Sequence, residues 1–372
     1  MIASSLQKSP RIFGLDLMRA IAILMVLSSH VLWIYPTTTG SVISLIHWFG
    51  YLGVELFFVL SGFLIGGILL KVFLQESFSL STLFWFLKRR WYRTLPNYYL
   101  VLGINLLIAL VIGYTLDDPW KYVFFWQNLA SPMLPFFTES WSLSVEEYAY
   151  VLLPAVLGLG YFLFQPTNKS AYFFWSVLCL ILVFIFTKYI WYTNHPNPTS
   201  EQWNLGLKSV VIYRLDAIFM GVLCSWIQLN FQTFWKKYSE IFALLGIGLF
   251  SLLTVGVSYF KLQMSTAPFF WTVLYLPLHS LAIAFFLPLL SQWTKLTISW
   301  MERPIVWISK ISYSVYLLHY GVILQLMNYY FPTETLAMST LTIYVLIYLV
   351  ITFIASSLLY RYYEKPIMDL RD

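Results

Sequence analysis

The chain has 372 residues, of which 60% are hydrophobic, 20% aromatic and only 10% charged. An average soluble protein has roughly 25% charged residues, and a water-soluble fold of this length needs a polar shell that 38 charged side chains do not supply. The formal charge of +6 fits basic loops between apolar runs better than nucleic-acid binding. Composition therefore excludes a soluble enzyme and indicates a membrane protein.

Ten apolar stretches follow one another along the chain. A transmembrane helix needs about 20 mostly apolar residues, and such stretches occur at 14–35, 42–70, 94–114, 143–164, 171–191, 208–228, 238–258, 270–290, 305–328 and 336–360. The first stretch starts like a signal peptide, but Asp16 and Arg19 interrupt it, so we expect it to be retained. We expect an all-α polytopic bundle of about ten helices, forming a single membrane domain over 1–372 with no appended soluble domain.

The distribution of Lys and Arg predicts the orientation of this bundle. With the N-terminus in the cytoplasm, sixteen of the 22 cations fall on the cytoplasmic side, and Arg19 and Arg214 lie within spans. The outer side receives Lys121, Lys188, Lys208 and Lys261. This bias satisfies the positive-inside rule. Both termini are therefore predicted to be cytoplasmic, and the segment 115–142, with its Trp and Pro residues, is predicted to face outward.

The first span carries ionisable groups, which are costly in lipid and usually functional. Arg19 and His30 are 11 residues apart, which returns to within roughly 20° of the same helical face after a rise of about 16 Å. Asp16 precedes Arg19 by three residues and can pair with it. Two interpretations stay open: a satisfied ion pair with a structural histidine, or a functional polar stripe.

The second span, GYLGVELFFVLSGFLIGG, contains Glu55 and Ser61 in an apolar run. We expect Glu55 to lie near the outer end of the span and to reach water there, which favours a structural role over a catalytic one. Gly62 and Gly66 form a small-xxx-small pair. Such pairs allow helices to approach closely, so we expect another helix to pack against them.

The segment FLKRRWYRTLPNYY places four cations before the third span. Arg90 and Arg93 are three residues apart and therefore adjacent on one helical face. Two guanidinium groups side by side suit a phosphate or pyrophosphate, although clustered cations beside a membrane also bind anionic lipid. Pro96 is expected to bend or restart the helix that follows.

The segment ESWSLSVEEYAYVLLP opens the fourth span. Ser144 and Glu147 match the spacing of a capping box, which predicts a helix that begins near residue 143 and gives Glu147 a structural role. Glu146 has no such structural explanation. Trp141 and Ser142 are expected to precede the helix at the outer mouth, where an aromatic ring and a hydroxyl suit a sugar-like acceptor.

Further polar residues occur singly in the remaining spans. Arg214 and Asp216 are two residues apart, so they do not share a helical face and each is expected to need its own partner. Four other histidines lack neighbouring ligand residues at metal-binding spacings, so we expect structural roles and no metal site; they are His47, His195, His279 and His319.

Together these segments resemble the acyltransferase family 3 membrane proteins, which move acyl groups from a cytoplasmic donor onto extracytoplasmic sugars. GLDLMRAIAILMVLSSH is similar to that family's motif of arginine, ten residues and histidine, and RWYR followed by Pro96 looks like its RxxR element. GVELFFVLSGFLI, WSLSVEE, SYSVYLLH and YRYYEKP also resemble family segments. Glu55 stands where the family often has Asp, and members with a fused extracytoplasmic hydrolase domain are longer.

The resemblance implies an O-acyltransferase of the bacterial cytoplasmic (inner) membrane. Its expected donor is cytoplasmic acyl-CoA, with acetyl-CoA favoured, and its expected acceptor is a hydroxyl of an extracytoplasmic glycan such as lipopolysaccharide O-antigen or another surface polysaccharide. Acyl-CoA, glycan and membrane lipid are the expected partners, with no tightly bound cofactor and no nucleic acid. The expected roles are catalysis for His30 and Glu146, donor binding for Arg19, Arg90 and Arg93, and acceptor binding or support for Trp141, Ser142, Arg214, Asp216, Glu55 and Ser61.

Two alternatives from other classes stay open. A transporter or flippase that moves a glycan intermediate or an acyl carrier would also need buried charges and a polar cavity. Such a carrier more typically has inverted repeats with broken helices, which this sequence does not display. A membrane scaffold is a weaker alternative, because it leaves the intramembrane Arg, His and Glu without a role. For the transferase, His30 acts either as a base, which we favour, or as a transient acyl carrier.

Overall fold

The computed structural model describes residues 11–370 except 36–39, 114–115, 297 and 335. In this part of the chain all regular elements are helical and there is no strand, which confirms the all-α prediction. Lys8 and Arg371, two of the cations used to predict orientation, lie outside the described residues. The long helices are α1 (Phe13–Val31), α2 (Ser41–Phe73), α3 (Leu80–Ile112), α5 (Ser140–Phe164), α6 (Lys169–Asn194), α8 (Leu215–Asn230), α10 (Ser239–Ser251), α12 (Tyr275–Ala284), α14 (Ser299–Leu318) and α16 (Met338–Leu359).

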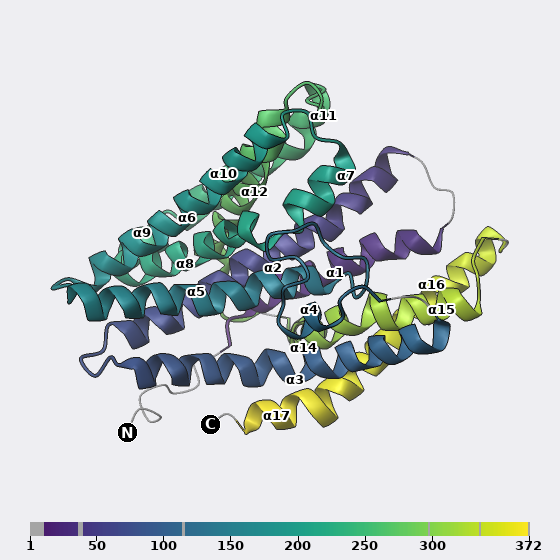
Figure 1. Cartoon of the computed structure of the whole chain (residues 1–372), viewed down its shortest axis with the longest axis horizontal. Coiled ribbons are helices and arrows are strands. Elements are labelled where there is room, and N and C mark those ends of the chain that lie inside the picture. Colours follow the sequence, from purple (N-terminus) through teal and green to yellow (C-terminus); the bar gives the residue numbers. More distant parts are fainter. Residues whose placement is uncertain (1–10, 36–39, 114–115, 297, 335, 371–372) are drawn as a thin grey trace.

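Short helical segments extend or connect these helices (Figure 1). Five of them, η3, η5, η6, η7 and η8, are π-helical, a form found mostly as single turns and frequently at functional sites. The segments are η2 (Leu32–Ile34), α4 (Trp120–Val123), α7 (Ser200–Trp203), η3 (Asn204–Lys208), η4 (Val211–Tyr213), α9 (Gln232–Lys237), η5 (Leu252–Gly256), α11 (Val257–Tyr259), η6 (Phe270–Leu274), α13 (Leu287–Leu290), η7 (His319–Leu324), α15 (Gln325–Tyr330), η8 (Tyr360–Glu364) and α17 (Lys365–Asp369).

Eight helices among the described residues are long and apolar enough to cross a membrane. They are Phe13–Ile34, Val42–Phe73, Leu80–Ile112, Ser140–Phe164, Lys169–Asn194, Ser239–Tyr259, Phe270–Leu290 and Met338–Asp369. The expected span at 208–228 corresponds to the shorter α8, and the one at 305–328 to α14 with η7 and α15. The total of ten spans and the cytoplasmic position of both termini stay predictions.

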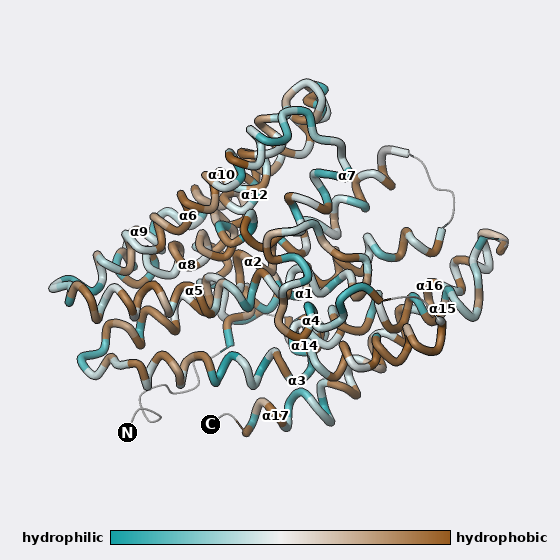
Figure 2. Tube along the Cα trace, viewed as in Figure 1, coloured by the Kyte–Doolittle hydropathy of each residue, from teal (hydrophilic) through white to brown (hydrophobic). Residues whose placement is uncertain are grey.

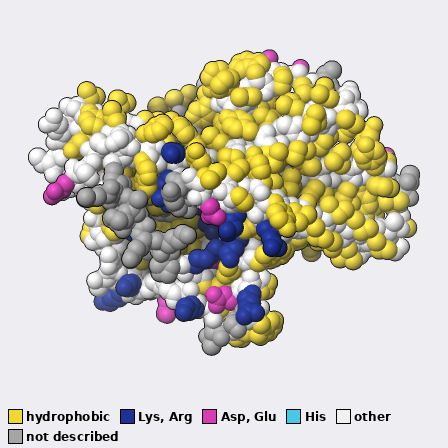
Figure 3. Space-filling view, turned by 90° about the horizontal axis from the view of Figure 1, so that it is seen from below, with side chains coloured by type: hydrophobic (Ala, Val, Ile, Leu, Met, Phe, Trp, Pro, Cys, Tyr) yellow, Lys and Arg dark blue, Asp and Glu magenta, His cyan; other side chains and the backbone are white. Residues whose placement is uncertain are grey.

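Apolar side chains cover much of the outside of the bundle. Leu110, Val111, Leu163, Phe164 and Leu244 are each at least two-thirds exposed. The long helices are predominantly hydrophobic along their length (Figure 2), and a broad hydrophobic surface flanks a group of Lys and Arg side chains in the view from below (Figure 3). In water this surface would be unfavourable, whereas lipid chains solvate it, as expected of a multi-pass membrane protein.

The centre of the bundle is α2, which packs most extensively on α8 and α1. The close approach depends on glycine: a Cβ atom on Gly62 would lie 1.9 Å from the carbonyl oxygen of Ile218, and one on Gly66 would lie 2.7 Å from Cα of Val222. From the other side, a Cβ on Gly221 would lie 2.0 Å from the carbonyl oxygen of Val59. The predicted packing role of the two α2 glycines is confirmed.

Pro96 was expected to bend or restart the helix, and of these two outcomes the restart is wrong. Helix α3 continues through Pro96 from Leu80 to Ile112. Its 33 residues correspond to about 50 Å, whereas the hydrocarbon core of a bilayer is about 30 Å thick. The helix is therefore longer than a bilayer core requires. Its cationic part, which contains Arg90 and Arg93, continues directly into the apolar span and is not a separate helix.

The predicted capping box is also wrong. Helix α5 begins at Ser140, so Ser144 lies inside the helix and its hydroxyl accepts a hydrogen bond from Nε2 of Gln127 at 2.7 Å. Oε1 of Glu147 accepts a hydrogen bond from the Thr94 hydroxyl at 2.6 Å, which ties α5 to α3. Glu147 therefore has a structural contact, but with another helix and not at a helix start.

Candidate functional site

A cavity lies between α1, α2, α3, α5 and α14, and we call it the central cavity. Six residues singled out in the sequence line it, which are Arg19, Ser61, Arg90, Arg93, Ser142 and Glu146. The rest of its wall comes from Val54, Phe57, Phe58, Leu60, Leu64, Thr94, Leu143, Tyr150, Ser312, Tyr313 and Tyr316. The lining thus combines three guanidinium groups, one carboxyl group and several hydroxyls with an apolar wall. Such a combination suits a ligand that has an anionic part and a less polar part.

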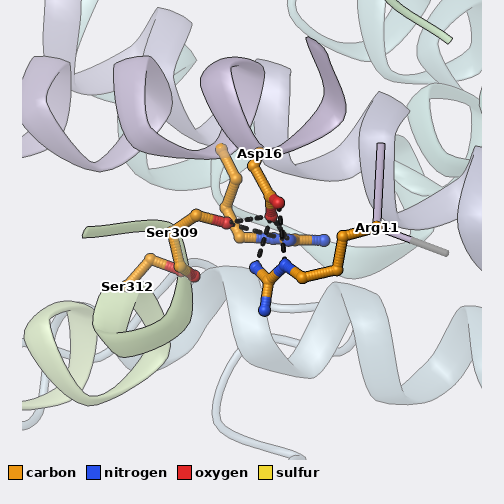
Figure 4. A network of polar contacts seen from close by, with 5 residues as sticks. Arg11, Asp16, Ser309 and Ser312 are labelled. Carbon is orange, nitrogen blue, oxygen red and sulfur yellow. Dashed lines mark hydrogen bonds and ion pairs between the residues drawn. The ribbon is translucent and has the colours of Figure 1, made fainter. Parts of the chain in front are cut away.

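Arg19 is held at the cavity by α14 and by its own helix. Its Nη1 donates to the Ser309 hydroxyl at 3.2 Å and lies 3.5 Å from Oδ1 of Asp16, which confirms the predicted pair. Asp16 receives stronger contacts from Arg11, at 2.6 and 2.9 Å, and from Ser309 at 2.6 Å (Figure 4). Because Asp16 is already saturated by these donors, part of the Arg19 guanidinium charge remains available to the cavity.

Tyr150 connects the cationic and acidic parts of the cavity. Its hydroxyl donates to Oε2 of Glu146 at 2.8 Å and lies 2.5 Å from the Ser61 hydroxyl and 3.4 Å from Nη2 of Arg90. The Arg90 guanidinium also packs 4.8 Å from the centre of the Tyr150 ring. Sequence reasoning missed Tyr150, although its position four residues after Glu146 places both on one face of α5.

Ser142 and Trp141 lie in the first turn of α5, not before the helix as expected. The Ser142 hydroxyl is 2.6 Å from the Tyr316 hydroxyl, which donates to the carbonyl oxygen of Glu139 at 3.1 Å. Trp141 does not line the central cavity. It is buried against Phe58, and Nζ of Lys208 lies 5.5 Å from the centre of its ring. Burial lowers the pKa of Lys208 to about 8.

His30 is paired with His319, a contact that no sequence motif predicted. Nε2 of His319 lies 3.3 Å from Nδ1 of His30, and the two rings meet edge to face with centroids 4.7 Å apart. His319 is fully buried at the first position of the π-helical segment η7, directly after α14. The sequence predicted a structural role for His319 but not this contact, which arises because α1 and α14 pack side by side.

Backbone contacts fix the protons on these two rings. Nδ1 of His30 lies 2.9 Å from the carbonyl oxygen of Val26, and Nδ1 of His319 lies 2.8 Å from that of Tyr316. Carbonyl oxygens only accept hydrogen bonds, so each neutral ring carries its proton on Nδ1. His30 then donates to Val26 and to His319, and its Nε2 is unprotonated. Within the described residues no hydrogen bond to this nitrogen occurs, and His30 is only half-buried.

Tyr316 links the histidine pair to the central cavity. Its side chain lines the cavity, and its ring centroid is 5.8 Å from that of His319. His30 itself does not line the cavity but lies eleven residues along the uninterrupted helix α1 from Arg19. Arg19 therefore lies at the central cavity, and the unprotonated Nε2 of His30 lies about 16 Å further along α1.

Glu55, Arg214 and Asp216 do not join this site. Glu55 of α2 pairs with Arg214 and accepts from the hydroxyl of Ser280, while Asp216 pairs with Lys188 of α6. All four charged side chains are at most 1% exposed. The separate partners predicted for Arg214 and Asp216 are confirmed, but the expected access of Glu55 to water is wrong. Lys188, counted among the outer cations, is buried within α6, and the side of the membrane on which it lies stays a prediction. Charges without water need partners, and α2, α6, α8 and α12 converge here to supply them.

The chain matches a family model and several curated proteins. The model of a family described as "Acyltransferase domain" matches residues 12–361. The chain is 26% identical to "Putative O-acetyltransferase SACOL0978" of Staphylococcus aureus (strain COL) over 95% of its own length and 56% of that protein. It is also 26% identical to "O-acetyltransferase OatA" of Staphylococcus aureus (strain NCTC 8325 / PS 47), over 96% of its own length and 58% of that protein.

The chain thus spans a little over half the length of these curated relatives. No solved structure matches the chain. The match to the family model extends from the residue before α1 into η8 and so includes every helix that lines the central cavity as well as the histidine pair. The chain belongs to the family of acyltransferase domains.

Proposed function

We propose that the protein is a membrane O-acyltransferase that moves an acyl group, with acetyl favoured, from acetyl-CoA to a hydroxyl group of an extracytoplasmic glycan. The observation that carries this proposal is that one helix, α1, holds Arg19 at the arginine-lined central cavity and, eleven residues further on, His30 with an unprotonated Nε2. Family membership and the names of the relatives support acyl transfer to oxygen. We place this activity in a membrane because eight helices among the described residues are suited to crossing a bilayer, and in the bacterial cytoplasmic membrane because the donor is cytoplasmic in this proposal.

The donor binds through its phosphates in this proposal. Arg19, Arg90 and Arg93 line one cavity from two helices, and guanidinium groups bind phosphate oxygens in paired, charge-assisted hydrogen bonds. A pantetheine arm is long enough to reach along α1 from this anchor, over about 16 Å, toward His30. The apolar wall that includes Val54, Phe57 and Leu60 accommodates the uncharged part of the donor.

The acyl transfer step uses His30 as a general base. Nε2 of His30 removes the proton from the acceptor hydroxyl while its oxygen attacks the thioester carbonyl. The tetrahedral intermediate collapses, the C–S bond breaks, and the imidazolium returns the proton to the leaving CoA thiolate. The products are the ester of the glycan and free CoA. His319 is the positioning residue, because its Nε2 accepts from Nδ1–H of His30 and holds the ring in the basic tautomer.

Glu146, Ser61 and Tyr150 form a hydrogen-bonded group beside Arg90. In the proposal this group orients Arg90 toward the donor, so that Glu146 acts on the arginine rather than on the transferred proton. The cluster of Glu55, Arg214, Lys188 and Asp216 supports the fold and contacts neither substrate. Ser142 positions Tyr316, which lines the donor cavity and lies beside His319.

The experiment is transfer of labelled acetyl from acetyl-CoA to purified bacterial surface glycans by the full chain in lipid nanodiscs. We expect His30→Ala to reduce transfer by on the order of 100-fold or more while acetyl-CoA still binds. His195→Ala is the matched control, because His195 is exposed and lies outside the central cavity. Near-normal transfer by folded His30→Ala would contradict the mechanism, and movement of unlabelled glycan across a bilayer without transfer of label would favour a carrier.

A further inference from the structure

A second pocket, separate from the central cavity, lies between the first half of α2 and the segments from η5 to α12. Its volume is about 330 Å³, within the range of small-molecule sites. Three aromatic rings form much of its wall: Trp48 and Trp271 are stacked with centroids 6.0 Å apart, and Tyr275 lies 4.3 Å from Trp271 and 5.8 Å from Trp48. Lys261 and Gln263 are exposed at its rim. We call this the aromatic pocket.

The wall of this pocket includes a histidine with a buried, unpaired acceptor. His279 lines the pocket and is 0% exposed, and its Nδ1 lies 3.0 Å from the carbonyl oxygen of Tyr275. The proton of the neutral ring is therefore on Nδ1, and Nε2 presents a lone pair. Nε2 has no hydrogen-bond partner in the described part of the chain. A buried polar atom left unpaired is costly, so this nitrogen indicates a ligand that donates a hydrogen bond.

The charges around the pocket limit which kinds of ligand could donate a hydrogen bond to His279. A quaternary ammonium suits an aromatic wall but has no N–H to donate, and the positive charge of Lys261 at the rim opposes any cation. An anion is not a hydrogen-bond donor. A plain hydrocarbon chain would cover the rings but leave Nε2 of His279 unpaired. The combination fits a neutral molecule with a hydroxyl group and a face of C–H bonds, which packs against the electron-rich face of indole.

The aromatic pocket lies at the same level of the bundle as His30. The Ser29 hydroxyl donates to the carbonyl oxygen of His47 at 3.2 Å, so the neighbours in sequence of His30 and Trp48 are bonded to each other. A Cβ on Gly50 would lie 2.6 Å from Oγ of Ser29, which shows how closely α1 and α2 approach here. The pocket is thus on the histidine side of the molecule, away from the cationic start of the stripe at Arg19.

We propose that the aromatic pocket binds a pyranose unit of a neutral carbohydrate, whose C–H face packs against Trp48 and whose hydroxyl donates to Nε2 of His279. Carbohydrate binding at this position is independent of the proposed activity. Its use as a holding site for the acceptor glycan, one step from His30, rests on the proposed function.

The experiment is saturation-transfer difference NMR on the full chain in nanodiscs without acyl donor. The probes are methyl glucopyranoside, N-acetylglucosamine and N,N′,N″-triacetylchitotriose, with choline as the cationic probe. We expect saccharide binding with a dissociation constant on the order of millimolar, weak because a single ring has few contacts. Trp48→Ala should weaken it about tenfold and His279→Leu roughly fivefold. His279→Gln, whose side-chain oxygen can still accept, should recover part of the loss.

Trp300→Ala is the matched control, since Trp300 is a 73% exposed tryptophan outside the pocket and its loss should leave saccharide binding unchanged. If His279→Leu does not fold, the saccharide binding of Trp48→Ala still tests the proposal, because Trp48 is only half-buried. Absence of binding for all three saccharides, equal binding by Trp48→Ala, or tighter binding of choline would each overturn the proposal. The NMR measurement contains no acyl donor and so tests carbohydrate binding separately from acyl transfer. If the native chain binds saccharides but shows no transfer in the labelled-acetyl assay, the proposed function is refuted and the proposed binding site is not.

Discussion

Nε2 of His319 lies 3.3 Å from Nδ1 of His30 and accepts a hydrogen bond from its N–H, which joins α1 to the π-helical segment η7. This contact and the Val26 carbonyl both point at the same nitrogen of His30, so they favour one tautomer and leave the other nitrogen, Nε2, as a base. A residue that sequence reasoning treated as structural therefore controls the chemistry available to the residue proposed as the base.

His319→Ala is expected to lower turnover roughly tenfold, less than loss of His30 itself, with the KM for acetyl-CoA unchanged. His319→Gln should recover part of the turnover, because its side-chain oxygen can accept from Nδ1–H of His30. The measurement is steady-state transfer with both substrates varied. A loss expressed in the KM for the donor, or no rescue by Gln together with reduced thermal stability, would assign His319 to folding instead.

Arg90→Lys and Arg93→Lys are each expected to raise the KM for acetyl-CoA about tenfold, since lysine retains the charge but loses the paired hydrogen bonds to phosphate. Lys88→Ala is the matched control, because Lys88 is an exposed cation of the same helix that does not line the central cavity. Equal effects of all three substitutions would show that the cations act only through the membrane surface.

Glu146→Gln should reduce transfer more than Glu147→Gln. Glu146 accepts from Tyr150 beside Arg90, whereas Glu147 accepts from the Thr94 hydroxyl, a contact that the glutamine oxygen can replace. Tyr150→Phe, which removes the hydroxyl shared by Glu146, Ser61 and Arg90, should resemble Glu146→Gln. Transfer assays at matched protein levels test this order, and it would be contradicted by a larger loss in Glu147→Gln.

What the sequence predicted well depends on short-range geometry. The spacing of Arg90 and Arg93, and that of Arg19 and Asp16, requires only the repeat of a helix. In the structure Arg90 and Arg93 line the same cavity, and Arg19 and Asp16 form the expected ion pair. Likewise, two residues that cannot share a helical face, Arg214 and Asp216, have different partners.

What failed depends on contacts far apart in the chain. His30 and His319 are separated by 289 residues, and Glu147 and Thr94 by 53. The spacing of Ser144 and Glu147 is that of a capping box, but the same spacing occurs inside any helix, and only the true start at Ser140 distinguishes the two cases. Burial of Glu55 follows from the meeting of α2 with α8 and α12, which hydropathy along one helix does not reveal.

The predicted orientation can be tested at Asp118, which is half exposed and paired with Lys121 at 2.7 Å. In a variant without Cys179 and Cys224, a cysteine introduced by Asp118→Cys should react with a membrane-impermeant maleimide added outside intact cells. A cysteine introduced by Lys88→Cys should react only after the cytoplasmic side is opened. The reverse pattern would invert the topology and with it the proposed direction of transfer.

Glu139, the residue before α5, is expected to make a pH-dependent contribution to stability. Its Oε1 accepts from the backbone N–H of Gly321 at 2.8 Å, next to His319 and Tyr320, and it is 4% exposed. Oε2 has no partner among the described residues. Burial raises the pKa of Glu139 from 4.5 to about 7 despite the hydrogen bond from Gly321. The fold therefore favours the protonated carboxyl group.

Because the folded pKa of Glu139 is above the unfolded value, its contribution to stability is fully present below about pH 4.5 and is lost as the pH rises through about 7. We expect Tm to fall between about pH 5 and pH 8 in the native chain. Glu139→Gln should flatten this fall, because the amide oxygen still accepts from Gly321 but no longer ionises. Glu76→Gln, at an exposed glutamate, is the control and should leave the slope unchanged. An equal slope in Glu139→Gln and the native chain, measured by thermal unfolding in detergent, would show that Glu139 does not titrate in this range.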